Sequence, residues 1–505
     1  MSRKRSKPKK NPRILVVTPE ITYLPDGMGN MVNYLNAKGG GLADVSATLV
    51  SHLFEQGVDI HVALPHYRKM FNIDIGNFIN EKLRIYKNKL PDERIHLAED
   101  RVFYYRDQVY DGYEQGDINF SLVFQREVIN NIITRVRPDL IHCNDWMTGL
   151  VPAMARRLDI PCLFTVHNIH TLKVTLKRIE HTGIDAAEFW QHLFFDRLPY
   201  NYEESRNSNL IDLLTSGVFA AHYINTVSPT FLKEVVKGQH KFINGSVRNE
   251  FINKSKAGYA DGVLNSPDPA YNPVDDKALV RNFSAQNFEK GKLANKRHLQ
   301  EHLGLIRDDN APIFFWPSRL DPVQKGCQLF TNILYRVISK YWKNNLQVVI
   351  VANGSYQQHF HDVVRRHDFY ERVSVCNFEE QLSHLAYAAS DFLLMPSLFE
   401  PCGLPQMICQ LYGSLPIAHD TGGIHDTVSH LNVSKNSGNG FLFKHYDSHG
   451  LSWTIDEAME FYHLPVSVKK KQITRIMKKS AAQFNCSVTA KHYMDIYEKM
   501  LAMPM

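Results

Sequence analysis

The feature that most constrains the fold is a strand–loop–helix–strand pattern near the start of the chain. Residues 14–17 form a short apolar run typical of a buried strand, and residues 58–64 form another. Between them, apolar residues recur at helical spacing behind three consecutive glycines, and Gly57 closes the expected helix. Two strands joined through a helix pair in parallel, so this pattern predicts a parallel α/β sheet.

The rest of the chain repeats this pattern in two blocks. Strands are expected at residues 140–142, 163–166 and 223–227, and then at residues 313–316, 346–351, 373–376, 392–395 and 415–418. Because 505 residues exceed what one hydrophobic core usually supports, we expect two domains, with the loop-like stretch 262–273 as their linker. The expected divisions are a disordered basic tail at 1–12, Rossmann-like domains at 13–265 and 266–485, and a terminal helix at 486–505.

A single acid lies at a sharp corner after one strand of the second block. The strand at residues 392–395 ends in a Pro–Ser turn, and Glu400 follows before the next apolar run. Ligand chemistry in open α/β sheets gathers where strands end. An isolated glutamate is most often a surface residue. However, Lys38, Arg319 and Lys325 follow other expected strands, so we predict that these strand ends carry chemistry.

Seven short motifs occur in an order that resembles the bacterial glycogen synthases and plant starch synthases. They are KGGGLADV (38–45), HCNDW (142–146), TVHN (165–168), TVSP (226–229), SRL with QKG (318–320 and 324–326), FEPCGL (399–404) and TGG (421–423). The resemblance spans most of the chain. It implies the α/β fold called GT-B, in which two doubly wound Rossmann-like domains face a cleft and a C-terminal helix crosses back to the first domain. It also implies a retaining glucosyltransferase.

The basic and glycine-rich motifs suit a nucleotide sugar that loses its diphosphate. Negative charge builds on the leaving oxygen, and preorganised positive groups that stabilise it usually make the largest catalytic contribution. The glycines after Lys38 allow the backbone, and the amides that start the next helix, to approach an anion. The resemblance assigns Arg319 and Lys325 to the donor diphosphate. For the TGG turn, a phosphate-approach loop and a simple turn before a helix both remain open.

The resemblance also implies a set of residues for each role. The predicted catalytic residues are Glu400, Lys325, Arg319, His167 and Asp145. The predicted substrate-binding residues are Lys38, Gly39, Gly40, Gly41, Asp44, Asn265, Phe378, Cys402, Gly403, Leu404, Thr421, Gly422 and Gly423. Of these, Asp145 and His167 would contact the transferred glucose, Asn265 the donor and Phe378 the base. We interpret the thiol of Cys402 as a small packing group in a tight turn and not as a nucleophile.

Glu400 matches the glutamate that is essential in this family. One mechanism that retains the anomeric configuration is a front-face displacement, in which the departing phosphate takes the proton of the acceptor. Glu400 would then position the sugar and stabilise the cation-like carbon. The carboxylate pair of glycoside hydrolases is not visible, because Ile408 stands where the motif would need a second acid.

The cysteines and the net charge limit which cell compartment and which partners can be expected. The seven cysteines are scattered and none form a C-x-x-C pair, which predicts reduced thiols in a cytoplasm and no zinc site. The resemblance implies no metal and no cofactor. Part of the net charge of +6 lies in the N-terminal tail, for which we expect a solvated terminus and no nucleic-acid partner. No segment has the length of a membrane span, and none after the tail suits a signal peptide.

The chain departs from the family in places that affect the substrate prediction. Residues 23–37 are an extra segment, which we expect to border the acceptor cleft and reshape glucan binding. Gly39 replaces a small hydroxyl residue, which we expect to loosen the loop, and Ser266, Leu398 and Pro405 also differ. The resemblance to the bacterial members implies ADP-glucose as the favoured donor, with UDP-glucose as the alternative, and an α-1,4-glucan as the acceptor. Two alternative functions remain open. One is a GT-B transferase of another sugar or acceptor, and the other is a non-catalytic glucan-binding homologue.

Overall fold

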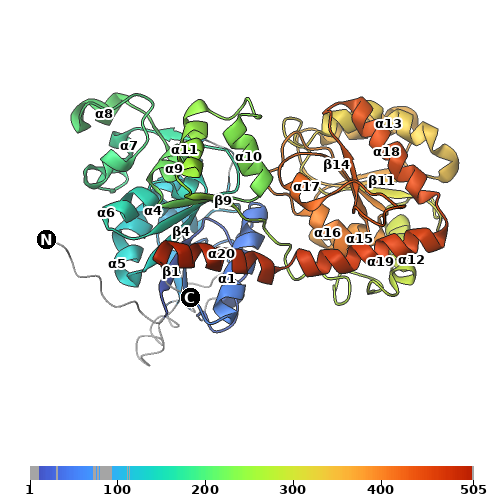
Figure 1. The fold of residues 1–505 in the computed structure, drawn as a ribbon, viewed down its shortest axis with the longest axis horizontal. Coiled ribbons are helices and arrows are strands. Elements are labelled where there is room, and N and C mark those ends of the chain that lie inside the picture. The colour runs from blue at the N-terminus through green and yellow to red at the C-terminus, as the bar shows by residue number, and fades with distance from the viewer. Residues whose placement is uncertain are drawn as a thin grey trace. The chain divides into compact units, whose positions relative to one another are not determined.

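The computed structural model describes residues 11–502, except for 30–31, 72–75, 77–78, 80–93, 111 and 113. The chain divides into two compact units, and the basic tail lies almost wholly outside the described residues (Figure 1). Unit 1 consists of Met1–Val227, Leu232–Asn265 and Cys486–Met505. Unit 2 consists of Ser228–Phe231 and Ser266–Asn485. Each unit is described by itself below.

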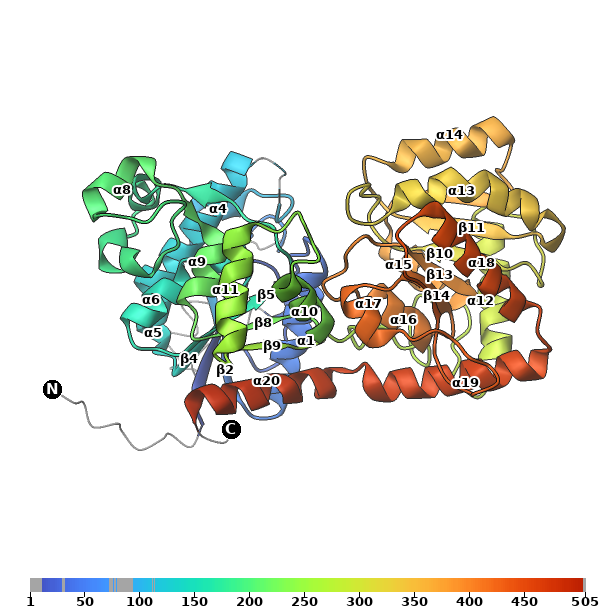
Figure 2. The ribbon, with the colours of Figure 1, turned by 45° about the horizontal axis from the view of Figure 1, so that its top comes forward.

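Unit 1 contains a parallel sheet with the strand order β3-β2-β1-β4-β5-β8-β9. Figure 2 labels β2, β4, β5, β8 and β9 of this sheet. The strands are β1 (Arg13–Val17), β2 (Asp59–Pro65), β3 (Ile95–Ala98), β4 (Leu140–Asn144), β5 (Cys162–Val166), β8 (Tyr223–Thr226) and β9 (Ala260–Gly262). A two-residue antiparallel pair, β6 (Lys173–Val174) with β7 (Ile211–Asp212), lies outside it. The central strands β1, β4 and β5 are almost wholly buried, which explains why apolar residues predominate in them.

Helices connect the strands of unit 1. The predicted first helix is confirmed as α1 (Gly41–Glu55), which ends just before Gly57 in the left-handed conformation. The other α-helices among the described residues of unit 1 are α3 (Arg101–Tyr104), α4 (Glu114–Glu127), α5 (Ile133–Val136), α6 (Val151–Arg157), α7 (Leu176–His181), α8 (Tyr202–Ser208), α9 (Leu213–Ala220) and α11 (Gly245–Lys256). α10 (Pro229–Lys237) begins in the short segment Ser228–Phe231 of unit 2 and continues into unit 1. Short 3-10 or π turns are η1 (Val32–Tyr34), η2 (Val128–Ile132), η3 (Trp146–Thr148), η4 (Ala186–Glu188) and η5 (Trp190–His192).

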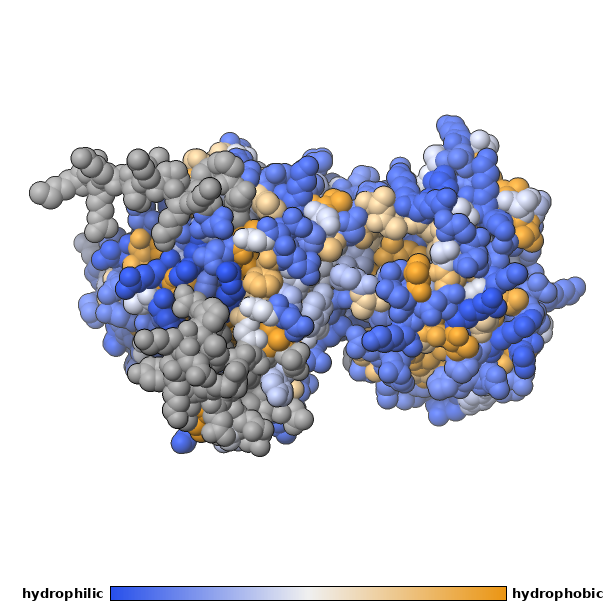
Figure 3. Space-filling model, turned by 90° about the horizontal axis from the view of Figure 1, so that it is seen from below, coloured by the Kyte–Doolittle hydropathy of each residue, from blue (hydrophilic) through white to orange (hydrophobic). Residues whose placement is uncertain are grey.

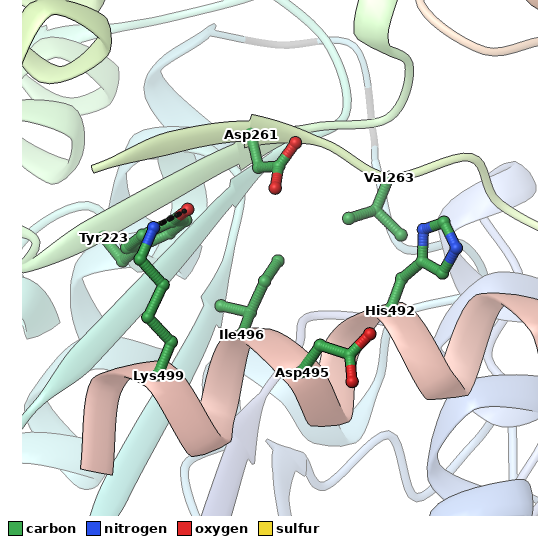
Figure 4. Close-up of a pocket in the computed structure, with 7 residues that line it drawn as sticks. All are labelled: Tyr223, Asp261, Val263, His492, Asp495, Ile496 and Lys499. Carbon is green, nitrogen blue, oxygen red and sulfur yellow. Dashed lines mark hydrogen bonds between the residues drawn. The ribbon is translucent and has the colours of Figure 1, made fainter. Parts of the chain in front are cut away.

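The C-terminal helix α20 (Cys486–Leu501) belongs to unit 1, although it follows unit 2 in the sequence. Its buried Tyr497 hydroxyl lies 2.7 Å from His142 Nδ1, and the Tyr493 hydroxyl accepts from Asn225 at 3.1 Å. Lys499 donates to the Tyr223 hydroxyl at the rim of a hollow of about 200 Å³ between α20 and strands β8 and β9 (Figure 4). These polar contacts join α20 to the middle of the sheet.

Unit 2 has a six-stranded parallel sheet with the order β12-β11-β10-β13-β14-β15. Its strands are β10 (Ile313–Trp316), β11 (Gln347–Val351), β12 (Val373–Cys376), β13 (Phe392–Met395), β14 (Leu415–His419) and β15 (Phe441–Phe443). Its helices are α12 (Phe288–His302), α13 (Cys327–Lys340), η6 (Trp342–Asn344), α14 (Gln357–His367), α15 (Glu380–Ala389), α16 (Pro405–Leu411), α17 (Gly422–Thr427), α18 (Ser448–Tyr462) and α19 (Val466–Gln483). One apolar core lies under α13, α14 and α18, and the other under α12, α15 and α16.

The strand order of each sheet reverses at one point. In unit 1 the chain moves outward from β1 through β2 and β3 and then returns to place β4 on the other side of β1. In unit 2 the same reversal lies between the neighbouring strands β10 and β13. Ligands of open α/β sheets bind outside the carboxyl ends of the strands at such reversals. The loops after β1, β4, β10 and β13 are therefore where the candidate site is expected.

The described residues of the extra segment 23–37 contact α1. An antiparallel bridge between Ile21 and Ala37 closes its base. Toward its tip, Gly27 lies against the Phe54 ring near the end of α1, and the Met28 carbonyl accepts from the Arg94 amide just before β3. The tip therefore lies toward the amino edge of the sheet, opposite the carboxyl ends of the strands. The expectation that this segment borders the acceptor cleft and reshapes glucan binding stays a prediction.

A buried lysine joins two helix ends in unit 2. The Lys292 ammonium donates to three backbone carbonyls, those of Ala388 at 3.0 Å, Ser390 at 2.7 Å and Tyr412 at 3.1 Å. These carbonyls lie at the ends of α15 and α16, where helices leave acceptors unpaired. Burial lowers the pKa of Lys292 to about 7.

We expect Lys292→Met to destabilise unit 2 by about 3 kcal/mol or more, because it leaves buried carbonyls without donors. Calorimetry should show the corresponding melting transition lowered by roughly 6–12 °C. Lys290→Met is the matched control, since Lys290 is an exposed residue of the same helix and should change stability by less than about 0.5 kcal/mol. Equal melting temperatures for the two variants would show that the lysine–carbonyl contacts contribute little.

The surface is of an ordinary kind. On the face drawn in Figure 3, hydrophilic residues predominate and hydrophobic ones lie among them in small groups, as on most folded domains. Within the described part of the chain, no helix has both the length and the apolar character needed to cross a membrane.

Candidate active site

In unit 2, the loops after β10 and β13 bring Lys325 and Glu400 into direct contact. The Lys325 ammonium lies 2.6 Å from Glu400 Oε2, and both side chains are largely buried. The Ser397 hydroxyl donates to the same oxygen at 3.1 Å. These two hydrogen bonds to one oxygen fix the direction of the carboxylate. The pair stands at the reversal of the sheet, where the sequence predicted a site.

The loop at residues 421–423 packs directly on the loop that carries Glu400. The Gly423 amide donates to the Glu400 carbonyl at 2.9 Å. A Cβ atom at Gly423 would lie 2.1 Å from the Cys402 carbonyl oxygen, so only glycine permits this approach. Thr421 and Gly422 are buried beside it. This turn supports the backbone around Glu400.

Arg319 and Phe378 are exposed and share a support in the turn after β11. Arg319 has no side-chain hydrogen bond or ion pair with the residues that the structure describes. The Asn353 carbonyl accepts from the Leu320 amide at 2.9 Å, and Asn353 Oδ1 accepts from the Phe378 amide at 2.9 Å. Asn353 thus holds the Arg319 loop next to the backbone of Phe378, whose side chain is 49% exposed. Both side chains can meet a ligand.

The remaining residues of the FEPCGL motif have mainly structural surroundings. Cys402 is buried, and its carbonyl accepts from Gln406 Nε2 at 2.9 Å. Gly403 has a φ of +73°, and Leu404 is the residue before α16. These contacts turn the chain sharply from β13 into α16, with Glu400 at the corner.

In unit 1, Asp145 and His167 come together from the ends of β4 and β5. Asp145 Oδ1 accepts from the amides of His167 at 2.7 Å and Asn168 at 3.3 Å. Asp145 has φ 58° and ψ 177°, a backbone conformation that costs about 1–3 kcal/mol outside glycine. Such strain is concentrated at functional positions. The geometry therefore marks Asp145 as a candidate site residue independently of its motif.

Burial sets the charge states of this pair. Burial raises the pKa of Asp145 to about 7, against the lowering effect of the two amide hydrogen bonds. Burial also lowers the pKa of His167 to about 3, so the imidazole is neutral at pH 7. Its Nε2 lies 2.9 Å from Asn144 Oδ1, which assigns the proton to Nε2. A neutral imidazole and a carboxyl that titrates near pH 7 can both hydrogen-bond a sugar hydroxyl.

The glycine loop after β1 differs from the prediction. Lys38 forms an ion pair with Asp44 at 2.9 Å. The amides of Gly39 and Gly40 do not point to an empty anion site, because both donate to Glu20 Oε2. The expectation that Gly39 loosens this loop is wrong, since Tyr110 and Glu20 fill the space beside it. Gly41 begins α1.

Several partners were not found from the sequence. Glu20, Tyr110, Ser397 and Asn353 had no motif of their own, although Glu20 follows the first strand just as Asp145 and Glu400 follow theirs. Asn265 is buried at the last position of its segment of unit 1, and its Oδ1 has no hydrogen-bond partner among the described residues. Within the same residues, no group of three or more His, Cys, Asp and Glu side chains is arranged to hold a metal ion.

Comparison with known proteins decides the family. The starch synthase catalytic domain family matches residues 13–247, and the family of glycosyl transferases group 1 matches residues 311–460. A glycogen synthase of Clostridium botulinum is 31% identical over 496 residues, which cover 92% of this chain and 96% of that protein. A glycogen synthase of Desulforamulus reducens is 32% identical with the same coverage. The chain belongs to the glycogen synthase family.

Solved structures agree with this glycogen synthase assignment at the level of the fold. The catalytic domain of starch synthase IV from Arabidopsis thaliana, solved with ADP and acarbose, is 24% identical and has a TM-score of 0.78. The match covers 98% of this chain and 100% of that one. The expected GT-B architecture of two doubly wound α/β domains is thus confirmed. The protein is a glycosyltransferase of the glycogen and starch synthase type, a class of retaining hexosyltransferases.

Proposed function

We propose that this protein transfers glucose from ADP-glucose to the non-reducing end of an α-1,4-glucan with retention of configuration. The observation that carries the proposal is the Lys325–Glu400 pair at the β10/β13 reversal. It places a cation and a carboxylate 2.6 Å apart in a largely buried setting. Loss of a diphosphate from a sugar needs this combination, because negative charge grows on the leaving oxygen while positive charge grows on the sugar carbon.

The two basic residues of unit 2 have different roles in this proposal. Lys325 is fixed by Glu400 and acts as a localised positive charge beside the leaving oxygen. Arg319 is exposed, and its guanidinium can bind a phosphate through two parallel hydrogen bonds. Lys325 therefore stabilises the charge that forms in the reaction, and Arg319 binds the charge already present on the donor.

Glu400 is proposed to position the glucose and stabilise its cationic carbon. Its Oε2 already accepts from Lys325 and from the Ser397 hydroxyl, which makes that oxygen a poor nucleophile. In a front-face displacement the departing phosphate takes the proton of the acceptor hydroxyl, so no second acid is required. The lone carboxylate at this corner is consistent with that route.

Asp145 and His167 are proposed to bind hydroxyl groups of the transferred glucose. His167 donates through Nε2 to Asn144, so its unprotonated Nδ1 can accept from a hydroxyl. Asp145 is held by two backbone amides, which fix its carboxylate in one orientation. Groups that are already fixed lose little entropy when the sugar binds.

Similarity to known proteins supports the proposed nucleotide and acceptor. The curated relatives are named glycogen synthases, and the starch synthase IV structure contains ADP and acarbose. These names favour ADP-glucose over UDP-glucose as donor and a glucan as acceptor. We further propose a reducing compartment such as the cytoplasm, since all seven cysteines are free thiols.

The test is incorporation of labelled glucose into glycogen with ADP-glucose and UDP-glucose run side by side. We expect transfer from ADP-glucose at a rate well above that from UDP-glucose. A reversed preference would assign the other donor. No transfer from either nucleotide, with glycogen binding intact, would contradict the proposal and favour a different sugar or a non-catalytic glucan-binding role.

A further inference from the structure

Glu20 is a buried carboxylate beneath the Lys38 loop, and it makes contacts that the proposed mechanism does not use. The residue is 2% exposed. Its Oε2 accepts from the Gly39 amide and, at 2.8 Å, from the Gly40 amide, while Oε1 accepts from the Tyr110 hydroxyl at 3.0 Å. The loop amides thus already bind an anionic group, and that group is the side chain of Glu20.

We propose that Glu20 is a positioning residue, a fixed internal anion that sets the conformation of the Lys38 loop, and that Tyr110 orients it. The proposal rests on the function proposed above and on the predicted role of Lys38 in binding the donor. Backbone amides in a glycine-rich loop have few constraints of their own. Two amides bonded to one buried carboxylate oxygen hold residues 39 and 40, and hence the adjoining Lys38, in a single arrangement.

Gly39 and Tyr110 form a matched pair in this arrangement. A Cβ atom on Gly39 would lie 2.5 Å from Tyr110 Cε2, 2.7 Å from Cδ2 and 3.0 Å from Glu20 Oε2. A Cβ atom on Gly40 would meet nothing within 4 Å. The glycine at 39 is therefore required by the Tyr110 ring and not by the backbone turn. Any side chain at 39 must displace the tyrosine or the carboxylate.

The Glu20 carboxylate also acts on Asp145. Burial raises the pKa of Glu20, while the amides of Gly39 and Gly40 and the Tyr110 hydroxyl lower it. The charge of Glu20 in turn contributes to the raised pKa of Asp145. The loop after β1 and the acid after β4 therefore lie within electrostatic range on the two sides of the strand-order reversal.

The first experiment separates the positioning role from a structural one. In Glu20→Leu, hydrogen exchange at the Gly39 and Gly40 amides should be faster, on the order of tenfold or more, because each loses its acceptor. The KM for ADP-glucose should rise and kcat should fall, while the KM for glycogen stays unchanged. Glu20→Gln keeps an oxygen that can accept both amides, and should recover part of both losses. Unchanged exchange, or equal changes in the two KM values, would overturn the proposal.

The second experiment tests the matched pair. Gly39→Ser should lower kcat/KM for the donor by about 10²-fold, since displacing a binding group by about 1 Å has such an effect. Gly40→Ser, the same change at the neighbouring glycine, should lower it much less. Gly39→Ser combined with Tyr110→Ala should be no worse than Tyr110→Ala alone, because the ring that clashes is gone. Equal effects of the two serines, or additive losses in the double variant, would overturn the pairing.

Failure of the proposed function can be told apart from failure of the Glu20 proposal. If the wild-type protein transfers glucose from neither nucleotide, the glucosyltransferase proposal fails. Hydrogen exchange of the Gly39 and Gly40 amides then decides the loop proposal alone. Faster exchange in Glu20→Leu, with recovery in Glu20→Gln, supports the internal anion, and identical exchange in all three proteins contradicts it.

Discussion

Replacing Glu400 by Gln is expected to lower kcat for glucose transfer by about 10³-fold or more while the protein still folds and binds glycogen. Gln has nearly the shape of Glu but carries no charge, so the cation-like carbon loses its stabilising carboxylate. The change also leaves Lys325 without the oxygen anion that lies 2.6 Å from its ammonium. Initial rates of labelled glucose incorporation measure the loss directly.

A matched control distinguishes this result from a general effect of removing a carboxylate. Glu289→Gln makes the same change at an ion pair with Lys470 on the surface of the same unit, with both side chains well exposed. It should leave turnover unchanged, since exposed pairs contribute at most about 1 kcal/mol to stability. Turnover of Glu400→Gln within tenfold of wild type would rule out the assigned role of Glu400.

Replacing Lys325 by Ala is expected to reduce kcat/KM for the nucleotide sugar by about 10²–10³-fold, with glycogen affinity unchanged. The ammonium supplies the positive charge beside the leaving diphosphate. Its removal also leaves Glu400 buried without its cationic partner, which costs stability as well as activity. Kinetics with each substrate varied in turn separates the two effects.

Two further variants support the interpretation of the Lys325 result. Lys325→Arg keeps the charge but replaces a compact ammonium with a planar fork, so it should recover only part of the activity. Lys340→Ala breaks an exposed ion pair with Asp456 in the same unit and should behave as wild type. If Lys325→Ala weakened donor and glycogen binding equally, its role would be structural.

The central strands of both sheets were predictable because they are buried. β10, β13 and residues 14–17 of β1 are continuous apolar runs, as expected of strands covered on both faces. Three edge strands, β3, β9 and β15, were missed, although the edge strand β12 was predicted at residues 373–376. Each is three or four residues long and pairs on one side only, so their sequences carry little of the strand pattern.

The residues of the candidate site were predictable where a motif named them, and their partners were not. Lys325 and Glu400 were each visible in the sequence, yet their contact spans 75 positions. Glu20 is 19 positions from Gly39, with the extra segment between them, so no local pattern could connect the two. Because of this separation, the sequence did not show that the loop amides donate to a carboxylate of the protein itself. The expectation that Gly39 loosens the loop was wrong for the same reason.

The sequence by itself determined the parallel α/β class, the family and the charged residues at the ends of the central strands. Those properties depend on local periodicity and on short motifs, which adjacent residues encode. Only the tertiary structure decided which charges pair, which amides are already occupied and which glycine makes room for a tyrosine. Those properties depend on contacts between strand ends that are far apart in the chain, and the order of strands in each sheet brings them together.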